Sequence, residues 1–216
     1  MTNLSSIATD LQTINNLLVK YEKNKALEYE ECLVLSTFYL HYKDTNAIIA
    51  MAEDELNTNA EHLFDIAKQL SEAATSFIVI YNQYSDFFQS FDPKPICDAY
   101  LKPFEEQYQE AKGISTQLWK DYSSLSNRLD FMAYEDDEYQ ATEDKCDKAK
   151  AEYDKAHAKT DELFTRFDKE RRKTVSLYYF DMMFLEVLVT RIDCIAKSII
   201  TDIDNLKAQG VLWADY

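Results

Sequence analysis

Apolar residues recur along most of the chain at alternating steps of three and four, the spacing of an α-helix with one buried face. The first row is Leu4, Ile7, Leu11, Ile14, Leu18 and Tyr21. A second row is Leu63, Ile66, Leu70, Ala73, Phe77, Ile80 and Tyr84. These rows predict a short helix over residues 3–21 and a long helix over 28–91.

Pro93 and Pro95 interrupt the helical pattern and predict a boundary between two helices. After them the steps of three and four continue through ten positions, which are Leu101, Phe104, Tyr108, Ala111, Ser115, Leu118, Tyr122, Leu125, Leu129 and Met132. An apolar period of 3.5 residues is typical of helices that supercoil around a neighbour. The pattern predicts a helix over 96–133 that packs in coiled-coil fashion.

A third helix is predicted over 139–208, after a polar turn at 134–139. Its first part has a row of smaller and more polar side chains, which are Cys146, Ala149, Tyr153, Ala156, Thr160, Leu163 and Phe167. From Val175 the apolar positions cover a much wider arc, which indicates burial on most sides. Gly210 is the predicted C-cap residue.

These elements predict an all-α fold of long antiparallel coiled-coil helices in one domain, residues 1–216. Residues 1–25 form an N-terminal helix or extension, and 28–208 form a three-helix coiled coil. We assign the wide apolar arc to a dimer interface, because an interface buries additional helix surface. The predicted interface residues are Leu177, Phe180, Met182, Leu185, Val189 and Ile192.

The composition argues against an enzyme. The 216 residues include only two glycines, which leaves little room for phosphate-binding loops or nucleophile elbows. The three histidines, His41, His62 and His157, are isolated and lack the paired Glu-x-x-His spacing of a bundle metal site. We therefore expect no catalytic residues, no cofactor, no metal and no small-molecule substrate.

With a formal net charge of −16 we expect no nucleic-acid partner, since nucleic-acid phosphates bind through Lys and Arg. Four widely spaced cysteines, Cys32, Cys97, Cys146 and Cys194, are expected to serve as small buried hydrophobes. The sequence shows neither a signal peptide nor an apolar run long enough to span a membrane. The predicted location is the cytoplasm, with peripheral attachment to membranes.

A basic stretch stands out in this acidic chain. Residues 145–173 contain ten basic and seven acidic side chains. One interpretation is ion pairing within helices, such as Asp168 with Arg172 and Asp161 with Lys169. The other is a strip that faces an anionic membrane. Its residues are Arg166, Lys169, Arg171, Arg172 and Lys173, with Lys155 and Lys159.

The second half of the chain resembles a BAR domain, most closely the sorting-nexin kind. The likeness lies in the Lys/Ala/Glu-rich stretch Ala149-Lys-Ala-Glu-Tyr-Asp-Lys-Ala-His-Ala-Lys and in Phe167-Asp-Lys-Glu-Arg-Arg-Lys-Thr-Val. The latter is similar to the family signature Phe-x-x-Glu-Arg-x-x-Asp-Phe, although Thr174 and Val175 stand near the Asp-Phe pair. The resemblance implies a three-helix protomer, a crescent-shaped dimer and binding to curved membranes.

Two functions follow as hypotheses. The first is a dimeric BAR-like scaffold, paired with itself or with a similar helical protein, that binds membranes or membrane-trafficking partners. The alternative is an acidic helical adaptor, chaperone or immunity protein that binds a basic protein, since opposite charge steers association.

Overall fold

The structure is a computed structural model that describes residues 3–21 and 26–211. Within these ranges the chain is helical and forms no β-strand, which confirms the prediction of an all-α fold. The helices of the described part are α1 (Leu4–Tyr21), α2 (Tyr29–Tyr42), α3 (Thr45–Gln83), α4 (Ser85–Gln89), α5 (Lys94–Asp130), α6 (Tyr139–Tyr178) and α7 (Met182–Ala208).

The prediction of one helix over 28–91 is wrong, because the segment contains α2, α3 and α4. Asp44 starts α3 as an N-cap residue whose side chain accepts a hydrogen bond from the backbone N–H of Asn46. Inside α3, Asn59 has non-helical dihedral angles and kinks the helix. The Asn59 side chain accepts a hydrogen bond from the His62 N–H (3.0 Å), as a cap for the turns that follow.

The helix predicted over 139–208 is also divided, into α6 and α7. Asp181 lies between them in an extended conformation, and its side chain accepts a hydrogen bond from the Met183 N–H (2.8 Å). The neighbouring Phe180 and Met182 are both buried. The apolar row runs through this break, which is why the sequence pattern does not reveal it. Gly210 follows α7 with a φ of 69°, as expected for a C-cap glycine.

The chain divides into two compact units, and the prediction of a single domain stays a prediction. The first, called the core unit, comprises Met1–Lys94 and Ser176–Tyr216. The second, called the hairpin unit, comprises Pro95–Val175. Most of α5 and α6 belongs to the hairpin unit, and the other helices belong to the core unit.

In the core unit, α3 packs against both α1 and α7, and α2 contacts α1 and α7. The apolar row of α1 is buried as predicted, and Leu63, Leu70 and Phe77 of α3 are at most 1% exposed. Buried polar groups join the helices: the Asn15 amide donates to the Ala73 carbonyl (2.8 Å), and the Ser71 hydroxyl donates to Asp193 (2.7 Å). The core unit therefore has a conventional apolar core with a few specific polar links.

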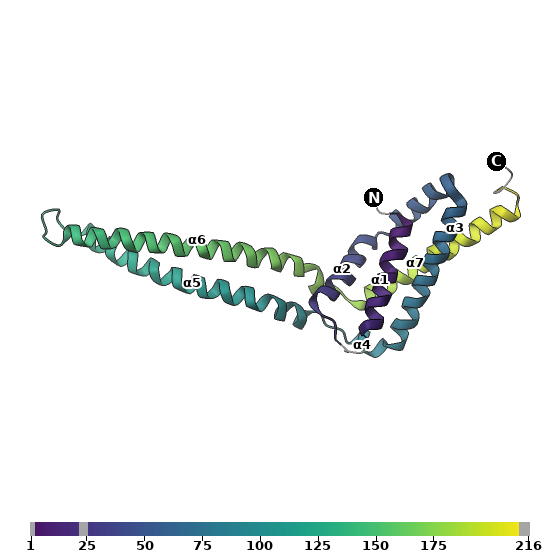
Figure 1. The fold of residues 1–216 in the computed structure, drawn as a ribbon, viewed down its shortest axis with the longest axis horizontal. Coiled ribbons are helices and arrows are strands. Elements are labelled where there is room, and N and C mark those ends of the chain that lie inside the picture. Colours follow the sequence, from purple (N-terminus) through teal and green to yellow (C-terminus); the bar gives the residue numbers. More distant parts are fainter. Residues whose placement is uncertain (1–2, 22–25, 212–216) are drawn as a thin grey trace. The chain divides into compact units, whose positions relative to one another are not determined.

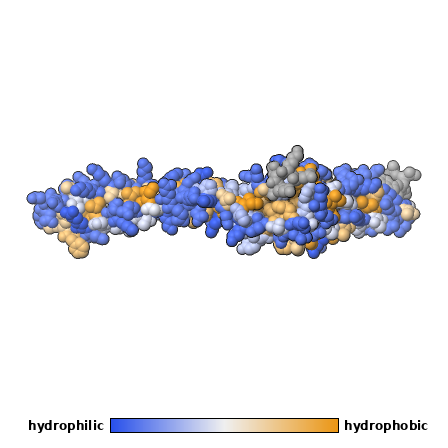
Figure 2. Space-filling model, turned by 90° about the horizontal axis from the view of Figure 1, so that it is seen from below, coloured by the Kyte–Doolittle hydropathy of each residue, from blue (hydrophilic) through white to orange (hydrophobic). Residues whose placement is uncertain are grey.

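In the hairpin unit, α5 and α6 run side by side in opposite directions and are joined by the turn that follows Asp130 (Figure 1). The residues predicted to line the contact between them, called the seam below, are buried or half-buried, and most residues beside them are exposed. On the face shown in Figure 2 the hairpin surface is mainly hydrophilic, with separate hydrophobic patches. The hairpin is thus a two-helix layer with a single row of contacts.

Candidate functional site: the seam of the α5–α6 hairpin

Aromatic rings fill the seam in two clusters. In one cluster the Tyr108 ring lies 5.4 Å from the Phe164 ring and 6.2 Å from the Phe167 ring. In the other, Tyr153 of α6 lies 5.1 Å from Trp119 and 6.4 Å from Tyr122. The outer members of each cluster remain open to solvent, since Trp119 is 48% exposed and Phe164 is 47% exposed. These rings hold the two helices together without being fully buried themselves.

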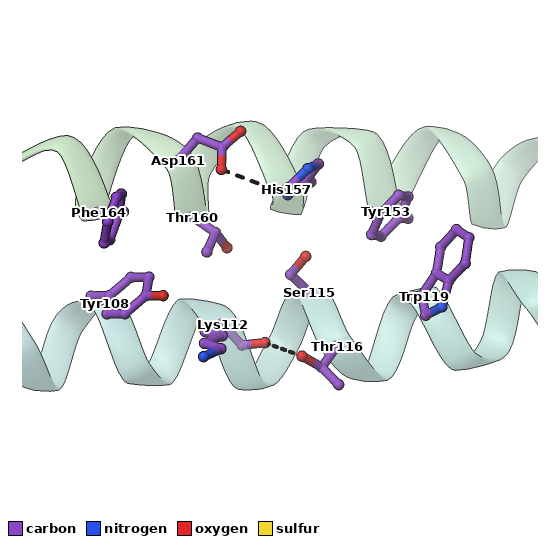
Figure 3. A pocket seen from close by; sticks show the side chains of 10 residues that line it. All are labelled: Tyr108, Lys112, Ser115, Thr116, Trp119, Tyr153, His157, Thr160, Asp161 and Phe164. Atoms are coloured by element: carbon purple, nitrogen blue, oxygen red, sulfur yellow. Dashed lines mark hydrogen bonds and ion pairs between the residues drawn. The ribbon is translucent and has the colours of Figure 1, made fainter.

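Between the two aromatic clusters the seam consists of small residues, and a hollow of about 430 Å³ results. Ser115 of α5 and Thr160 of α6 line this space, and Ala111 and Ala156 are their small neighbours in the same rows of steps. Figure 3 shows Ser115 and Thr160 directed into the space between the helices, with Trp119 and Tyr153 at one end and Tyr108 and Phe164 at the other. The larger rings at each end keep small residues from closing the gap.

The polar groups around the hollow do not form a catalytic arrangement. His157 pairs with Asp161 on the same helix at 3.8 Å, and the Thr160 hydroxyl donates to the Ala156 carbonyl (2.9 Å). Ser115 is only 7% exposed, and its side chain points into the hollow (Figure 3). A nucleophile requires a base within hydrogen-bond reach, and the contacts described for the side chains around the hollow include no such pair.

The predicted membrane-binding bases are largely paired with carboxylates of their own helix. Arg171 and Arg172 both donate to Asp168, at 2.9 and 2.7 Å. The hydrogen bond from Arg171 is the main reason that the pKa of Asp168 lies below its ordinary value, with Arg172 contributing. Lys173 pairs with Glu170 at 2.7 Å. The Asp168–Arg172 pair predicted from the sequence is thereby confirmed.

The remaining predicted bases have more varied surroundings. Lys159 pairs with Glu162 (2.9 Å), and the Arg166 guanidinium lies 5.1 Å from the centre of the Phe104 ring. The predicted pair of Asp161 with Lys169 is not formed, since Asp161 contacts His157 instead. Lys155 and Lys169 are exposed.

The residues predicted to form a dimer interface are buried within a single chain. Their exposed fractions are 5% for Phe180 and 0% for Leu177, Met182, Leu185, Val189 and Ile192. The wide apolar arc arises because α7 packs against α2, α3 and α4 of the same core unit. In this fold these six side chains present no surface to a second chain, and dimerisation itself stays a prediction.

The cysteines are buried as predicted at Cys32, Cys97 and Cys146, whereas Cys194 is exposed. None of the four forms a disulfide bond in the described part of the chain. The part of the chain that the structure describes holds no cluster of His, Cys, Asp and Glu suited to a metal ion. None of the described helices is both long enough and apolar enough to cross a membrane.

A seven-residue repeat in α6 escaped the search for motifs. From Cys146 to Lys173 the sequence reads CDKAKAE, YDKAHAK, TDELFTR and FDKERRK. Each unit begins with a seam residue and continues with an aspartate. The four aspartates, Asp147, Asp154, Asp161 and Asp168, therefore lie in one line beside the seam, on the side of Trp119 and Phe164. We call this line the aspartate edge.

On the opposite side of the same helix lies a second line, called the lysine edge. Its bases are Lys148, Lys155, Lys159, Arg166, Lys169 and Lys173. The two edges differ in helical position, because each aspartate follows a seam residue by one position and each base of the lysine edge follows one by two or six positions. A count of charges does not reveal this difference.

Comparisons with known proteins find no matching family model, no matching characterised protein and no matching solved structure. The BAR-domain resemblance therefore stays a prediction, and the functional argument depends on the geometry of the chain.

Glu170 provides a pH test of the hairpin. Hydrogen bonds from Lys173, and then from Tyr100 (2.7 Å), hold the pKa of this carboxyl below its ordinary value. A lowered pKa stabilises the folded state above the unfolded-state pKa of about 4.3, and this contribution disappears as the pH falls through the lower folded-state pKa. Wild-type protein should therefore lose more thermal stability between about pH 5 and pH 3 than Glu170→Gln.

The matched control is Glu152→Gln, at an exposed position of α6. It should follow the wild-type pH profile in melts recorded by circular dichroism. If Glu170→Gln and wild type lose thermal stability in parallel between about pH 5 and pH 3, the lowered pKa of Glu170 does not stabilise the hairpin.

Proposed function

We propose that this protein is a non-enzymatic helical scaffold that binds another protein along its α5–α6 hairpin. The observation that carries the proposal is the aromatic seam, whose rings stay half-exposed at Trp119 and Phe164 beside an unfilled hollow. Contiguous apolar surface with a polar rim is typical of protein interaction sites. Aromatic residues are also enriched where interfaces gain most of their binding energy.

The charge of the chain supports a basic protein as the partner. The net charge of −16 creates a field that accelerates association with positively charged molecules. The turn between α5 and α6 adds a dense acidic segment, since Glu135, Asp136, Asp137 and Glu138 are consecutive and exposed. This corresponds to the adaptor, chaperone or immunity-protein hypothesis.

Site-specific photo-crosslinking in cells that make the protein tests this proposal. Benzoylphenylalanine replaces one of two exposed hairpin residues on opposite sides of the seam, Trp119 or Ile114. We expect at least one of these positions to form an adduct with another polypeptide, because the partner lies along the hairpin.

The control position is Val79, which is 60% exposed in the core unit. Adducts at Val79 as abundant as those at the hairpin would indicate random collision. If neither Trp119 nor Ile114 forms an adduct, the proposal is contradicted.

Membrane binding is the second candidate function, and the lysine edge is the observation that favours it. Lys155 and Lys169 are exposed on this edge, and they lie two seven-residue periods apart in the repeat of α6. Each base near an anionic bilayer contributes about 1 kcal/mol of attraction. Arg171 and Arg172 lie off this edge and are paired with Asp168, so we expect them to contribute less.

Co-sedimentation with phosphatidylserine vesicles at low salt compares two charge-matched variants. If the lysine edge binds membrane, Lys155→Glu/Lys169→Glu should weaken binding at least about tenfold, since two attractive charges become repulsive. Arg171→Glu/Arg172→Glu should weaken it less. Equal losses, or no binding by wild type, would reject this candidate.

A further inference from the structure

We infer that the side of the hairpin bearing Trp119, Phe164 and the aspartate edge binds an α-helix of a partner protein that carries basic residues at seven-residue intervals. The inference rests on the proposed function and specifies the chemistry of the partner. It also selects one of the two sides of the seam as the docking surface.

The hollow supplies the apolar part of the recognition. Its volume of about 430 Å³ has room for a large side chain of the partner, inserted between the two aromatic clusters. In coiled coils a side chain of one helix enters a hole formed by residues of its neighbour, and here the space lies between two helices and is open to a third. Because the seams of α5 and α6 share the 3.5-residue period, a third helix with the same period matches them over several turns.

Ser115 adds a polar group to the hollow. This residue is 7% exposed, and its side chain points into the hollow in Figure 3. Its hydroxyl is not one of the fully buried side-chain atoms that lack a partner, so it stays within reach of solvent in the hollow. A polar atom of the partner helix can take the place of water there.

The aspartate edge supplies the charge complementarity. Seven residues of helix rise about 10.5 Å, so Asp147, Asp154 and Asp161 are spaced evenly over about 21 Å. Lys or Arg side chains at the same interval on a parallel or antiparallel helix would face each of them in turn. Asp168 contributes less, because Arg171 and Arg172 already bind it.

The same charges argue against a lipid surface on this side, since an anionic bilayer repels a row of carboxylates. Across the hollow, Lys112 of α5 lies with its amino group 5.7 Å from the Tyr108 ring centre. We therefore expect the basic residues of the partner to lie over α6 and its uncharged or acidic residues to lie over α5.

The test uses full-length protein and a synthetic amphipathic helix of about four heptads with one leucine/alanine seam and lysines flanking it. Fluorescence anisotropy of the labelled peptide measures binding, and a peptide with glutamates in place of the lysines is the charge control. A third peptide keeps the lysines and has serines in place of the leucines. We expect only the first peptide to bind with measurable affinity.

Two charge-matched variants then distinguish the edges of α6. Asp154→Lys/Asp161→Lys reverses the aspartate edge, and Glu152→Lys/Glu162→Lys makes the same change in net charge at exposed positions on the opposite side. The first should weaken peptide binding at least about tenfold and the second by less than about threefold, because exposed ion pairs act mainly at close range. Equal losses from both would overturn the inference.

Ser115→Leu tests the hollow itself. The added side chain occupies the space that the partner requires, so the variant should melt at or above the wild-type temperature and bind the peptide at least about tenfold more weakly. Unchanged affinity in a folded Ser115→Leu protein would show that the hollow is not the site. Crosslinks at Ile114 with none at Trp119 would likewise overturn this inference while leaving the proposed function intact.

Discussion

The hairpin depends on a limit that applies to any pair of helices: two cylinders in contact share one line of buried side chains. In α5 and α6 this line consists of large rings separated by Ala111, Ser115, Ala156 and Thr160. The rings are too large to be covered by one neighbouring helix, and the small residues are too short to meet across the gap. Exposed aromatic surface and a hollow are therefore direct consequences of the sequence of the seam.

The core unit avoids this limit because its helices have more than one neighbour. There α3 lies between α1 and α7, so its apolar row and theirs are covered from more than one side. Residues such as Leu70 and Leu185 are completely buried. The contrast is between a core unit whose apolar rows are covered by its own helices and a hairpin whose aromatic seam stays open to solvent.

The apolar periodicity of the sequence predicted much of this structure, and there is a physical reason for each feature that it did not predict. The steps of three and four located α1, α5, the turn after Asp130 and the residues of the seam, because helical burial depends directly on spacing. They did not locate the break at Asp181, where a capping side chain starts α7 while the apolar row continues. Nor could they show whether the wide arc around Leu185 faces another helix of the same chain or a second molecule.

The candidate site was predicted only in part. The sequence marked the charged stretch of α6 but not its division into two edges, which depends on the position of each residue around the helix. The hollow required the structure, since Ser115 and Thr160 lie 45 positions apart in the chain. The sequence also left open whether Asp168 pairs with Arg172, and in the structure both Arg171 and Arg172 are paired with it. Because of this pairing, the proposed binding surface is the open side of the seam and not these two bases.

Hydrogen–deuterium exchange on the full-length protein tests the central claim most directly. If the hairpin is a two-helix layer with an open side, its amides between Phe104 and Leu163 should exchange faster than those of Leu63–Tyr81 and Leu185–Ala196 in the core unit, because fewer buried contacts oppose local opening. Addition of the lysine-flanked helical peptide should slow exchange in the hairpin and leave the core unit unchanged. Protection of the free hairpin equal to that of the core unit, with no change on adding the peptide, would contradict the account.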